Sequence, residues 1–325
     1  MMKAMVIREL GGPDVFEQTS RPIPEVKPGH VLIAVKATSV NPLDTMLRSM
    51  GTPWSDNLPE ILHGDVAGIV TAVGEGVTQF QVGDDVYGCA GGIAGIDGAL
   101  AEYLLADADL IAHKPKRLSM REAAALPLVS ITAWEALVDK LAVQKDQKIL
   151  IHGGAGGVGH IAVQLAKHRG AVVHATASAG NRKIVKALGA DHVIDYRQTP
   201  VSDYVGQYTE AGFDSVFDTV AGENIQKSFE AVRFNGAVAT ILPVNDPLPI
   251  ALKGLSFHSV LQPIPLFHGV GRKRHGDILR AMAALVDEDV ISPLLDDSVF
   301  NIWDVAKAHQ RLSDGKATGK IVLTV

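Results

Sequence analysis

A chain of 325 residues is too long for one ordinary domain and suits two, and its 47% hydrophobic and 20% charged residues exclude a disordered protein. The formal net charge of -6 and the lack of a long basic run argue against a nucleic-acid partner. The single cysteine, Cys89, excludes an internal disulfide and a multi-cysteine zinc cluster.

The sequence shows no targeting segment and no membrane segment. The N-terminal stretch reaches Arg8 and Glu9 too soon to hold the apolar core of a signal peptide. Nowhere does the sequence contain the run of about 18 apolar residues that a membrane-spanning helix needs. We therefore expect a cytoplasmic protein that has no membrane partner.

The chain up to about Leu118 predicts short β-strands. Val31, Ile33 and Val35 alternate with Leu32, Ala34 and Lys36. Further apolar runs, each bounded by Gly, Pro or Asp, occupy Gly68–Val73, Asp85–Gly88, Glu102–Leu105 and Leu110–His113. Short strands at this spacing are typical of a barrel or a sandwich. The segment Arg121–Leu141, with apolar residues at three- and four-residue steps, is then predicted to be helical.

From Lys148 onward, strand and helix patterns alternate. The expected strands are Ile149–Ile151, Val172–Thr176, Val193–Ile194, Val216–Phe217 and Ala237–Ile241, and the expected helices are Ile161–His168, Arg182–Leu188, Tyr204–Thr209 and Ile225–Val232. This alternation predicts an α/β fold with a doubly wound parallel sheet. A helix over Ile278–Val286 and a last strand over Lys320–Thr324 follow. We place that strand back in the first domain, so the second domain is inserted into the first.

A glycine-rich segment, Gly153–Gly159, lies between the first strand and the first helix of this alternating region. Gly154, Gly156 and Gly159 form a G-x-G-x-x-G pattern, in which glycines allow a tight turn, close approach to a pyrophosphate and close packing of helix on strand. The N-terminus of the following helix offers unpaired N–H groups to an anion. A plain glycine turn is the alternative, but the flanking strand and helix favour a dinucleotide-binding loop.

The end of the next strand bears on the choice of dinucleotide. An NAD site has Asp or Glu about 20 residues after the glycines, but no carboxylate occurs between His174 and Lys183. Ser178, Arg182 and Lys183 stand there instead, and arginine makes strong bonds to phosphate. The segment therefore predicts NADPH as cofactor, with a solvated helix face as the alternative explanation of Arg182 and Lys183.

Several motifs together resemble the medium-chain dehydrogenase/reductase superfamily, in its zinc-independent, quinone-oxidoreductase-like branch. They are Gly153–Gly159, Asn41–Asp44, Leu62–Val70, Gly83–Tyr87, Leu126–Leu137, Leu188–Tyr196 and Gly319–Leu323. The resemblance runs along the whole chain in the same motif order. It implies a Rossmann sheet inserted into a GroES-like β-barrel catalytic domain. We expect residues 1–122 and 266–325 to form the catalytic domain and residues 123–265 to form the dinucleotide-binding domain.

The zinc ligands of the metal-using relatives are missing. In the resemblance, Asn41 stands where those proteins carry a cysteine, and Gly64 stands where they carry a histidine. His63 and Asp65 flank Gly64, but two ligands without a thiolate make a poor zinc site. We expect no metal.

The resemblance also implies site residues. Asn41 is similar to a pocket amide that faces the nicotinamide, Thr132 is similar to a threonine near it, and Tyr87 could donate its phenol proton. Their alternatives are a turn Asn before Pro42, a Thr bonded to its own helix and a packed Tyr. The expected cofactor-binding residues are Gly154, Gly156, Gly157, Val158, Gly159, Ser178, Arg182, Lys183 and, near the adenosine 2′-phosphate, Tyr196.

These expectations combine into one functional hypothesis. The chain is an NADPH-dependent reductase that transfers hydride to a quinone or to the double bond of an α,β-unsaturated carbonyl, without zinc. An alcohol or carbonyl dehydrogenase that uses a metal is the rival enzyme, and an NADPH-binding sensor or structural protein with little turnover is the rival of another class. The partner is a small-molecule substrate. The oligomeric state is open, with a homodimer paired through the edge segment Leu255–Leu261 as one candidate.

Overall fold

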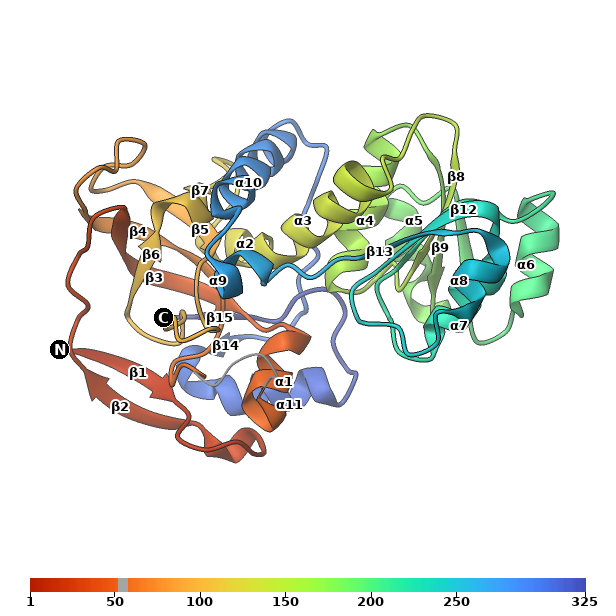
Figure 1. The fold of residues 1–325 in the computed structure, drawn as a ribbon. Helices are drawn as coiled ribbons and strands as arrows, with labels where there is room; N and C mark the ends of the chain where they lie inside the picture. Colours follow the sequence, from red (N-terminus) through yellow and green to blue (C-terminus); the bar gives the residue numbers. More distant parts are fainter. Residues whose placement is uncertain (52–57) are drawn as a thin grey trace. The chain divides into compact units, whose positions relative to one another are not determined.

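The computed structural model describes residues 1–51 and 58–325, and the chain divides into two compact units. Unit 1 comprises Met1–Leu128, Pro263–Asp289 and Pro293–Val325, and unit 2 comprises Val129–Gln262 and Val290–Ser292 (Figure 1). The expected insertion of an α/β domain into a β-rich domain is confirmed. The domain boundaries after residues 122 and 265 stay predictions; the first of them would divide the helix α2 (Met120–Ala124).

Unit 1 is built on one mixed sheet and a separate hairpin. The sheet has the strand order β14-β15-β3-β4-β5-β7, with β6 also paired to β3, and β1 pairs with β2. Its strands are β1 (Met2–Val6), β2 (Glu17–Arg21), β3 (His30–Ser39), β4 (Asp65–Val73), β5 (Asp85–Cys89), β6 (Tyr103–Asp107), β7 (Ile111–His113), β14 (Phe300–Asn301) and β15 (Val322–Thr324). The C-terminal strand β15 lies antiparallel beside β3, so segments from early and late in the chain meet in this sheet (Figure 1).

The helices of unit 1 cover the sheet and position the start of the candidate site. They are α1 (Pro42–Met50), α2 (Met120–Ala124), α9 (Ile264–His268), α10 (Arg272–Asp287) and α11 (Val305–Ser313). Helix α1 begins where β3 ends, with Asn41 as its N-cap residue and Pro42 in its first turn. Proline is favoured there because the N–H that it lacks would have no partner within the helix. The residues Val31, Ile33 and Val35 of β3 are buried in the core, as their alternation predicts.

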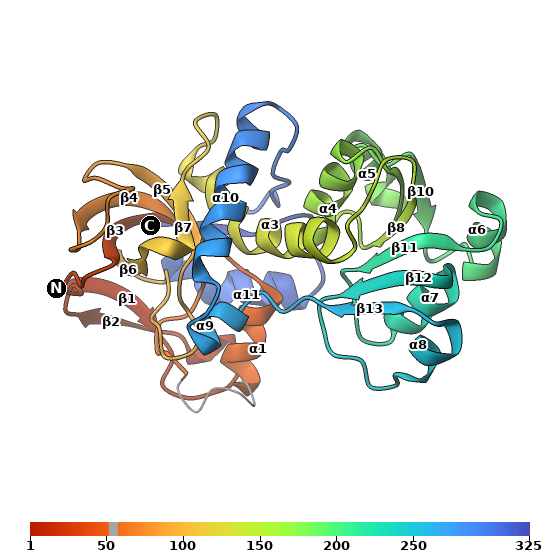
Figure 2. The ribbon, with the colours of Figure 1, turned by 45° about the horizontal axis from the view of Figure 1, so that its top comes forward.

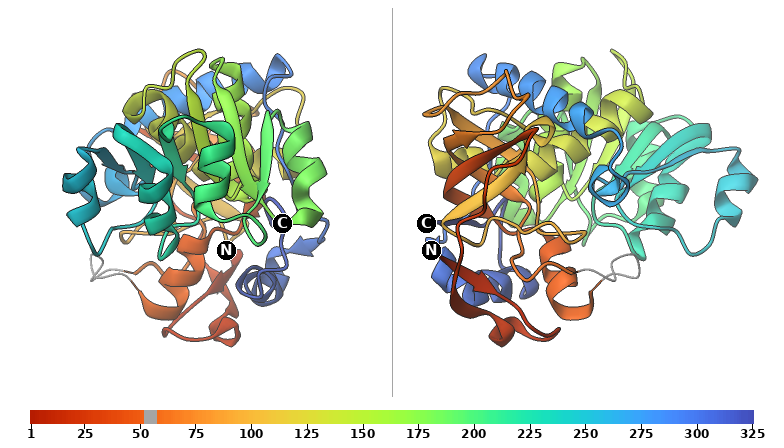
Figure 3. Two further views of the ribbon diagram at one scale, coloured as in Figure 1. Left: turned by 90° about the vertical axis from the view of Figure 1, so that its right-hand side faces the viewer. Right: turned by 60° about the vertical axis from the view of Figure 1, so that its left-hand side comes forward.

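Unit 2 is a parallel sheet of six strands in the order β10-β9-β8-β11-β12-β13. The strands are β8 (Lys148–His152), β9 (Val172–Ala177), β10 (His192–Asp195), β11 (Phe213–Asp218), β12 (Val232–Thr240) and β13 (Ser256–Ser259), and the helices are α4 (Gly157–His168), α5 (Arg182–Ala187), α6 (Val201–Tyr208), α7 (Asn224–Ala231) and α8 (Leu248–Lys253). Helices α4 and α5 cover one face, and α7 and α8 cover the other (Figures 2 and 3). Burial on both faces explains why Leu150, Val216 and Val238 are fully buried.

The expected helical segment Arg121–Leu141 is helical over most of its length, but it is divided into three parts. The structure has α2, then α3 (Pro127–Trp134), then a π-helical segment over Glu135–Lys140. Pro127 is the reason, because proline has no N–H to continue the ladder and disfavours a helical residue before it. The apolar spacing therefore predicts the helical conformation correctly, but it does not show the break before Pro127.

No helix formed by residues 1–51 and 58–325 has the length and apolarity needed to cross a membrane.

Candidate functional site

The glycine-rich loop of unit 2 has the geometry of a phosphate cradle. Strand β8 ends at His152, the chain turns at Gly153 with a φ of 75°, and α4 begins at Gly157 with Gly156 as its N-cap. A Cβ on Gly159 would lie 2.0 Å from the carbonyl oxygen of Gly153, so no larger residue fits there. A Cβ on Gly154 would lie 3.0 Å from the side chains of Ala175 and Val185. These contacts match the helix–strand packing role of glycine in a dinucleotide loop.

This loop leaves backbone donors for an anion. The first N–H groups of α4, including those of Gly157, Val158 and Gly159, have no partner within the helix. Gly156 has no side chain that could cap them, and the helix N-terminus carries a partial positive charge. The expected cofactor residues Gly154, Gly156, Gly157, Val158 and Gly159 are therefore arranged as a dinucleotide requires, although their contact with a cofactor stays a prediction.

The side chains expected around the adenosine phosphate do not share one pocket. Arg182 and Lys183, at the start of α5, line an open pocket of about 530 Å³ together with Asp191, His192 and Tyr208. Tyr196, which follows β10, lines a second pocket of about 210 Å³. Ser178 is half-buried at the end of β9. Sequence order alone gave no sign of this separation.

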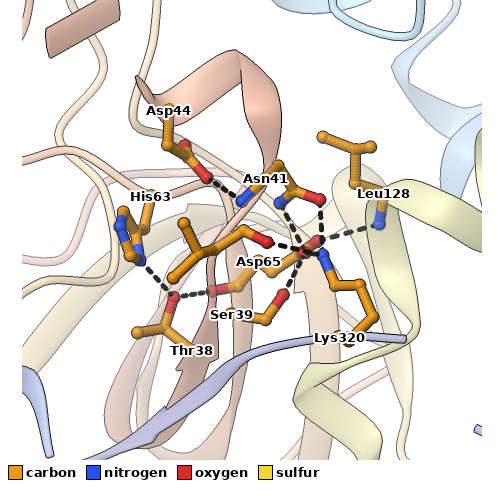
Figure 4. Close-up of polar contacts among 9 residues, drawn as sticks. Thr38, Ser39, Asn41, Asp44, His63, Asp65, Leu128 and Lys320 are labelled. Atoms are coloured by element: carbon orange, nitrogen blue, oxygen red, sulfur yellow. Dashed lines mark hydrogen bonds and ion pairs between the residues drawn. The ribbon is translucent and has the colours of Figure 1, made fainter. Parts of the chain in front are cut away.

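Unit 1 holds a dense polar cluster around the buried carboxylate of Asp65 (Figure 4). Its Oδ2 accepts hydrogen bonds from Ser39 Oγ at 2.6 Å and from Asn41 Nδ2 at 2.8 Å. Its Oδ1 accepts one from the backbone N–H of Leu128 at 2.8 Å. The ammonium of Lys320 lies 3.4 Å from Oδ2 and supplies the opposite charge. The carboxylate is thus bonded on both oxygens and paired, as a buried charge requires.

Lys320 holds the other end of the Asn41 amide. It is only 3% exposed, and its Nζ donates to Asn41 Oδ1 at 2.5 Å and to the carbonyl oxygen of Val40 at 3.1 Å. With Asp65 as third partner, each ammonium proton has an acceptor. Asn41 is therefore fixed in one orientation, with its oxygen toward Lys320 and one N–H toward Asp65. A side-chain hydrogen bond between Asn41 and Asp44 adds to these contacts.

Asp44 completes the start of α1. Its Oδ2 accepts a hydrogen bond from the backbone N–H of Asn41 at 2.7 Å (Figure 4). Burial raises the pKa of Asp44 to about 7; the nearby Asp65 charge adds to the rise, and the bond from Asn41 opposes it. The position therefore both orders the loop and carries a group that titrates near neutral pH.

Two buried histidines extend the cluster away from Asn41. Arg48 Nε donates to His309 Nδ1 at 3.3 Å, and the Nε2 atoms of His309 and His63 are 2.9 Å apart. His63 Nδ1 lies 3.4 Å from Thr38 Oγ1, which donates to the backbone oxygen of Asp65 at 2.6 Å. Burial lowers the pKa of His309 to about 3 and that of His63 well below its usual range, so both rings are neutral.

The other two expected catalytic residues have different surroundings. Tyr87 is completely buried, its hydroxyl donates to the carbonyl oxygen of Leu279 at 2.6 Å, and burial raises its pKa far above the usual value. Its phenol proton is committed to the core of unit 1, which matches the packed alternative. Thr132 lies in α3, within unit 2, and is 4% exposed. Its role beside a nicotinamide stays a prediction.

The residues at the zinc-ligand positions do not fit a zinc ion. Asn41 and Gly64 supply no thiolate or imidazole, and a Cβ on Gly64 would lie 2.8 Å from the sulfur of the buried Cys89. The side chains of His63 and Asp65 are each bonded to other groups. In the part of the chain that the structure describes, no three His, Cys, Asp or Glu side chains gather as a metal site would need.

Sequence reasoning missed three parts of this cluster: Ser39, Lys320 and His309. A lysine placed directly before an apolar C-terminal strand was a usable signal for Lys320, because such a lysine needs a buried partner. The contact between Lys320 and Asn41 joins residues 279 positions apart, and no local pattern predicts that.

Comparisons with known proteins agree with this architecture. Residues 27–116 match the alcohol dehydrogenase GroES-like domain, and residues 188–323 match a domain described as zinc-binding dehydrogenase. An NADPH-dependent alkenal/one oxidoreductase of Arabidopsis thaliana is 34% identical over 99% of this chain and 79% of its own. The quinone oxidoreductase of Homo sapiens is 30% identical over 99% and 98%.

A solved structure is closer still. An alcohol dehydrogenase superfamily protein from Novosphingobium aromaticivorans is 39% identical, covers all of both chains and superposes with a TM-score of 0.94. Matches of this length, together with the inserted Rossmann sheet and its phosphate loop, place the chain among oxidoreductases that bind a nicotinamide dinucleotide. The chain belongs to the medium-chain dehydrogenase/reductase superfamily, in its quinone-oxidoreductase-like branch.

Proposed function

We propose that this chain is an NADPH-dependent reductase that transfers hydride to a quinone or to the double bond of an α,β-unsaturated carbonyl, without zinc. The observation that carries the proposal is the fixed amide of Asn41, at the position where a metal-using relative would hold zinc. The names of the relatives support both substrate classes. The protein acts on small molecules, and we place it in the cytoplasm.

For this reaction the protein needs to orient the substrate and the cofactor and to stabilise the charge that develops on the substrate. When bound, the reduced nicotinamide supplies a hydride to the β carbon of an enone or to a quinone ring. Negative charge then grows on the substrate's carbonyl oxygen, and a preorganised N–H donor stabilises it. The amide of Asn41 is the proposed donor, because Lys320 and Asp65 prevent it from rotating. Water can supply the proton that the reduced product takes up.

The absence of a metal site separates this reaction from its rival. An unactivated alcohol must lose its hydroxyl proton before hydride can leave, and a metal or a strong base does that work. The described residues gather no three metal ligands, and Asp44 and Asp65 are both committed to hydrogen bonds. An activated double bond needs no such help. Reduction therefore fits the cluster better than metal-assisted alcohol oxidation.

The choice of NADPH rests on the end of β9. No carboxylate stands between His174 and Lys183 to accept a ribose 2′-hydroxyl. The proposed phosphate contacts are Ser178, Arg182, Lys183 and Tyr196; Arg182 and Lys183 line one pocket, and Tyr196 lines another. A homodimer paired through β13 is the corresponding proposal for assembly, since β13 is one of the two edge strands of the sheet.

Steady-state kinetics test the proposal. NADPH and NADH consumption are measured with a panel of quinones, enones, alcohols and simple ketones. The expected result is turnover of quinones or enones with a kcat/KM at least tenfold higher for NADPH, since one charged bond to phosphate supplies that factor. Turnover of alcohols alone would favour the metal-using dehydrogenase instead. Binding of NADPH without turnover of any of these compounds would favour the NADPH-binding sensor or structural protein.

A further inference from the structure

Lys320 supplies the positive charge of the polar cluster around Asp65 (Figure 4). Its side chain is 3% exposed, and lysine is almost never buried to this degree unless it is paired. Its ammonium bonds Asn41 Oδ1 and the carbonyl oxygen of Val40, and it faces Asp65 Oδ2. Loss of this side chain would remove a charged donor from all three acceptors at once, inside a part of unit 1 that water does not reach.

The segment that carries Lys320 is also bonded to the junction from which Asn41 projects. The N–H of Val40 donates to the carbonyl oxygen of Ile321 at 3.0 Å, while the carbonyl oxygen of Val40 accepts from the Lys320 ammonium at 3.1 Å. One residue further, Ser39 is the pairing partner of Val322 in β15. The end of β3 and the start of β15 therefore hold each other, and the position of Lys320 bears directly on that of Asn41.

The backbone of Lys320 is fixed by a turn that only glycine can make. Gly319 has a φ of 73°, and a Cβ at that position would lie 2.2 Å from the carbonyl oxygen of Leu294. The N–H of Lys320 donates to the same carbonyl oxygen at 2.9 Å, and the carbonyl oxygen of Lys320 accepts from the N–H of Asp296 at 2.9 Å. Lys320 is thus bonded on both sides to the segment Leu294–Asp296.

The side chain of Asp296 binds the turn from its other end. Its Oδ2 accepts a hydrogen bond from the N–H of Thr318 at 3.1 Å, so Asp296 contacts both neighbours of Gly319. Its Oδ1 accepts from Arg311 Nε at 2.6 Å. Burial alone would raise the pKa of Asp296, but the hydrogen bonds from Arg311, Ser298 and Thr318 lower it to about 2. The carboxylate is therefore ionised at neutral pH and holds the turn that presents Lys320.

The charge of Lys320 also acts on titratable groups on both sides of Asn41. Burial raises the pKa of Asp44, and the ammonium of Lys320 opposes that rise. Burial and the neighbouring His309 lower the pKa of His63, and Lys320 lowers it further. The ammonium thus contributes to the electrostatics of the site as well as to its geometry.

We propose that Lys320 is a positioning residue for the reduction: its ammonium holds the Asn41 amide in the orientation that the substrate meets, and Asp296 holds Lys320 in place. Both residues act through Asn41 rather than on the substrate itself. All of them belong to unit 1. The kinetic part of this assignment rests on the proposed function.

A double-mutant cycle tests whether Lys320 acts through Asn41. The kcat, the KM and the Kd of NADPH are measured for the parent, Lys320→Met, Asn41→Ala and the double variant, with the quinone or enone that the parent reduces best. Lys320→Met should lower kcat about tenfold or more, the size expected for one hydrogen bond to a charged group, and change the KM and the Kd only a few-fold. The double variant should be about as slow as Asn41→Ala alone, because residues that act as a unit are not additive.

Lys316→Met, at an exposed lysine before the same turn, is the control for Lys320→Met and should keep the kcat of the parent. A parent-like kcat in Lys320→Met would overturn the proposal. So would losses that multiply in the double variant, because Lys320 would then act independently of Asn41.

Asp296→Asn is a second variant that leaves the ion pair of Lys320 and Asp65 in place, so the proposal can be tested even if Lys320→Met does not fold. It should lower kcat several-fold, again without a further loss when combined with Asn41→Ala. Asp297→Asn is its matched control, because Asp297 bonds the same Arg311 at 2.8 Å but is 92% exposed and does not hold the turn. Equal kcat values for Asp296→Asn and Asp297→Asn would overturn the role of Asp296.

Hydrogen exchange of the Asn41 side-chain amide provides a readout without substrate. Nitrogen-15 labelling of asparagine, with the signal assigned by its loss in Asn41→Ala, follows exchange of the amide protons with water. Lys320→Met should speed this exchange about tenfold or more, because the amide loses its charged partner. Unchanged exchange in both Lys320→Met and Asp296→Asn would overturn the proposal. A parent that reduces neither quinones nor enones would instead overturn the proposed function and leave the exchange result intact.

Discussion

At the scale of single residues, the amide of Asn41 is bonded through both its oxygen and its nitrogen. Lys320 binds its oxygen and Asp65 binds one of its N–H groups, so the amide cannot flip or rotate when a ligand binds. A donor that is already oriented stabilises developing charge without reorganisation during the reaction. Two measurements at this scale follow from the contacts of Asn41 and Asp44.

Asn41→Ala should lower kcat with enones or quinones about ten- to a thousandfold, because it removes a donor that acts on the developing oxyanion. The Kd of NADPH should change only a few-fold. Ser49→Ala, an exposed position of α1 outside the cluster, is the control. If variant and parent have equal kcat, Asn41 serves only as a helix cap. If kcat falls only as far as the affinity for NADPH falls, Asn41 acts in cofactor binding.

Asp44 should make the stability of unit 1 depend on pH. In the folded chain its pKa is about 7, against 3.8 when exposed, so folding takes up a proton between these values. The contribution of Asp44 to the free energy of unfolding therefore falls as pH rises from about 4 to about 7. Asp44→Asn keeps the acceptor for the N–H of Asn41 and should gain stability over the parent by up to a few kcal/mol at pH 7.5, but not at pH 4. Urea unfolding at both pH values checks this, and an equal difference at both would contradict it.

At the scale of elements, the strand–loop–helix unit from β8 to α4 was the most predictable part of the protein. The apolar run, the glycines and the amphipathic helix each point to the same local structure. Elements without such a pattern escaped prediction: β2 has the sequence EQTSR, which is polar throughout, and α9 begins among prolines that read as a loop. Strand β12 starts at Val232, before its expected start at Ala237, because exposed polar residues at its beginning hid the period.

Gly159→Ala tests the phosphate loop. Its Cβ would approach the carbonyl oxygen of Gly153 to 2.0 Å, so the loop must shift. We expect a loss of about 1–3 kcal/mol in the free energy of unfolding and a weakening of NADPH binding of about tenfold or more.

Gly206→Ala is the matched control, because a Cβ at that position of α6 meets no atom within 4 Å. It should stabilise the protein by about 0.5–1 kcal/mol and leave cofactor binding unchanged. Equal effects of the two substitutions on cofactor affinity would remove the special role of Gly159.

At the scale of the whole molecule, the split arrangement of two units was predictable and the details of the site were only partly so. Alternation of strands and helices predicts a doubly wound sheet, and the return of the last strand to unit 1 follows from where the pattern changes. The side of the sheet to which a side chain points does not follow from sequence order, which is why Arg182 and Tyr196 were expected together. The Lys320–Asp65–Asn41 cluster joins three distant segments and required the tertiary structure.

The purified protein should keep its activity after extensive dialysis against a strong chelator. Asn41 and Gly64 occupy the positions of zinc ligands, and the described residues contain no cluster of three metal-binding side chains. The assay is turnover before and after chelation, with metal content measured on the same sample. Loss of turnover that added zinc restores would show that a metal takes part.

The hydrogen bonds that link the buried side chains from Arg48 through His309 and His63 to Thr38 all donate in the same direction. A guanidinium can only donate, so His309 must accept at Nδ1 and carry its proton on Nε2. That proton faces His63 Nε2, which must accept it, so the second ring is the opposite tautomer, with its proton on Nδ1 and directed at Thr38. Nitrogen-15 spectra should show these two histidines in different tautomers. Because each ring fixes the tautomer of the next, Arg48→Met should let both histidines exchange between tautomers. The hydrogen-bond dipoles of the two rings, which now all point the same way, would then average out.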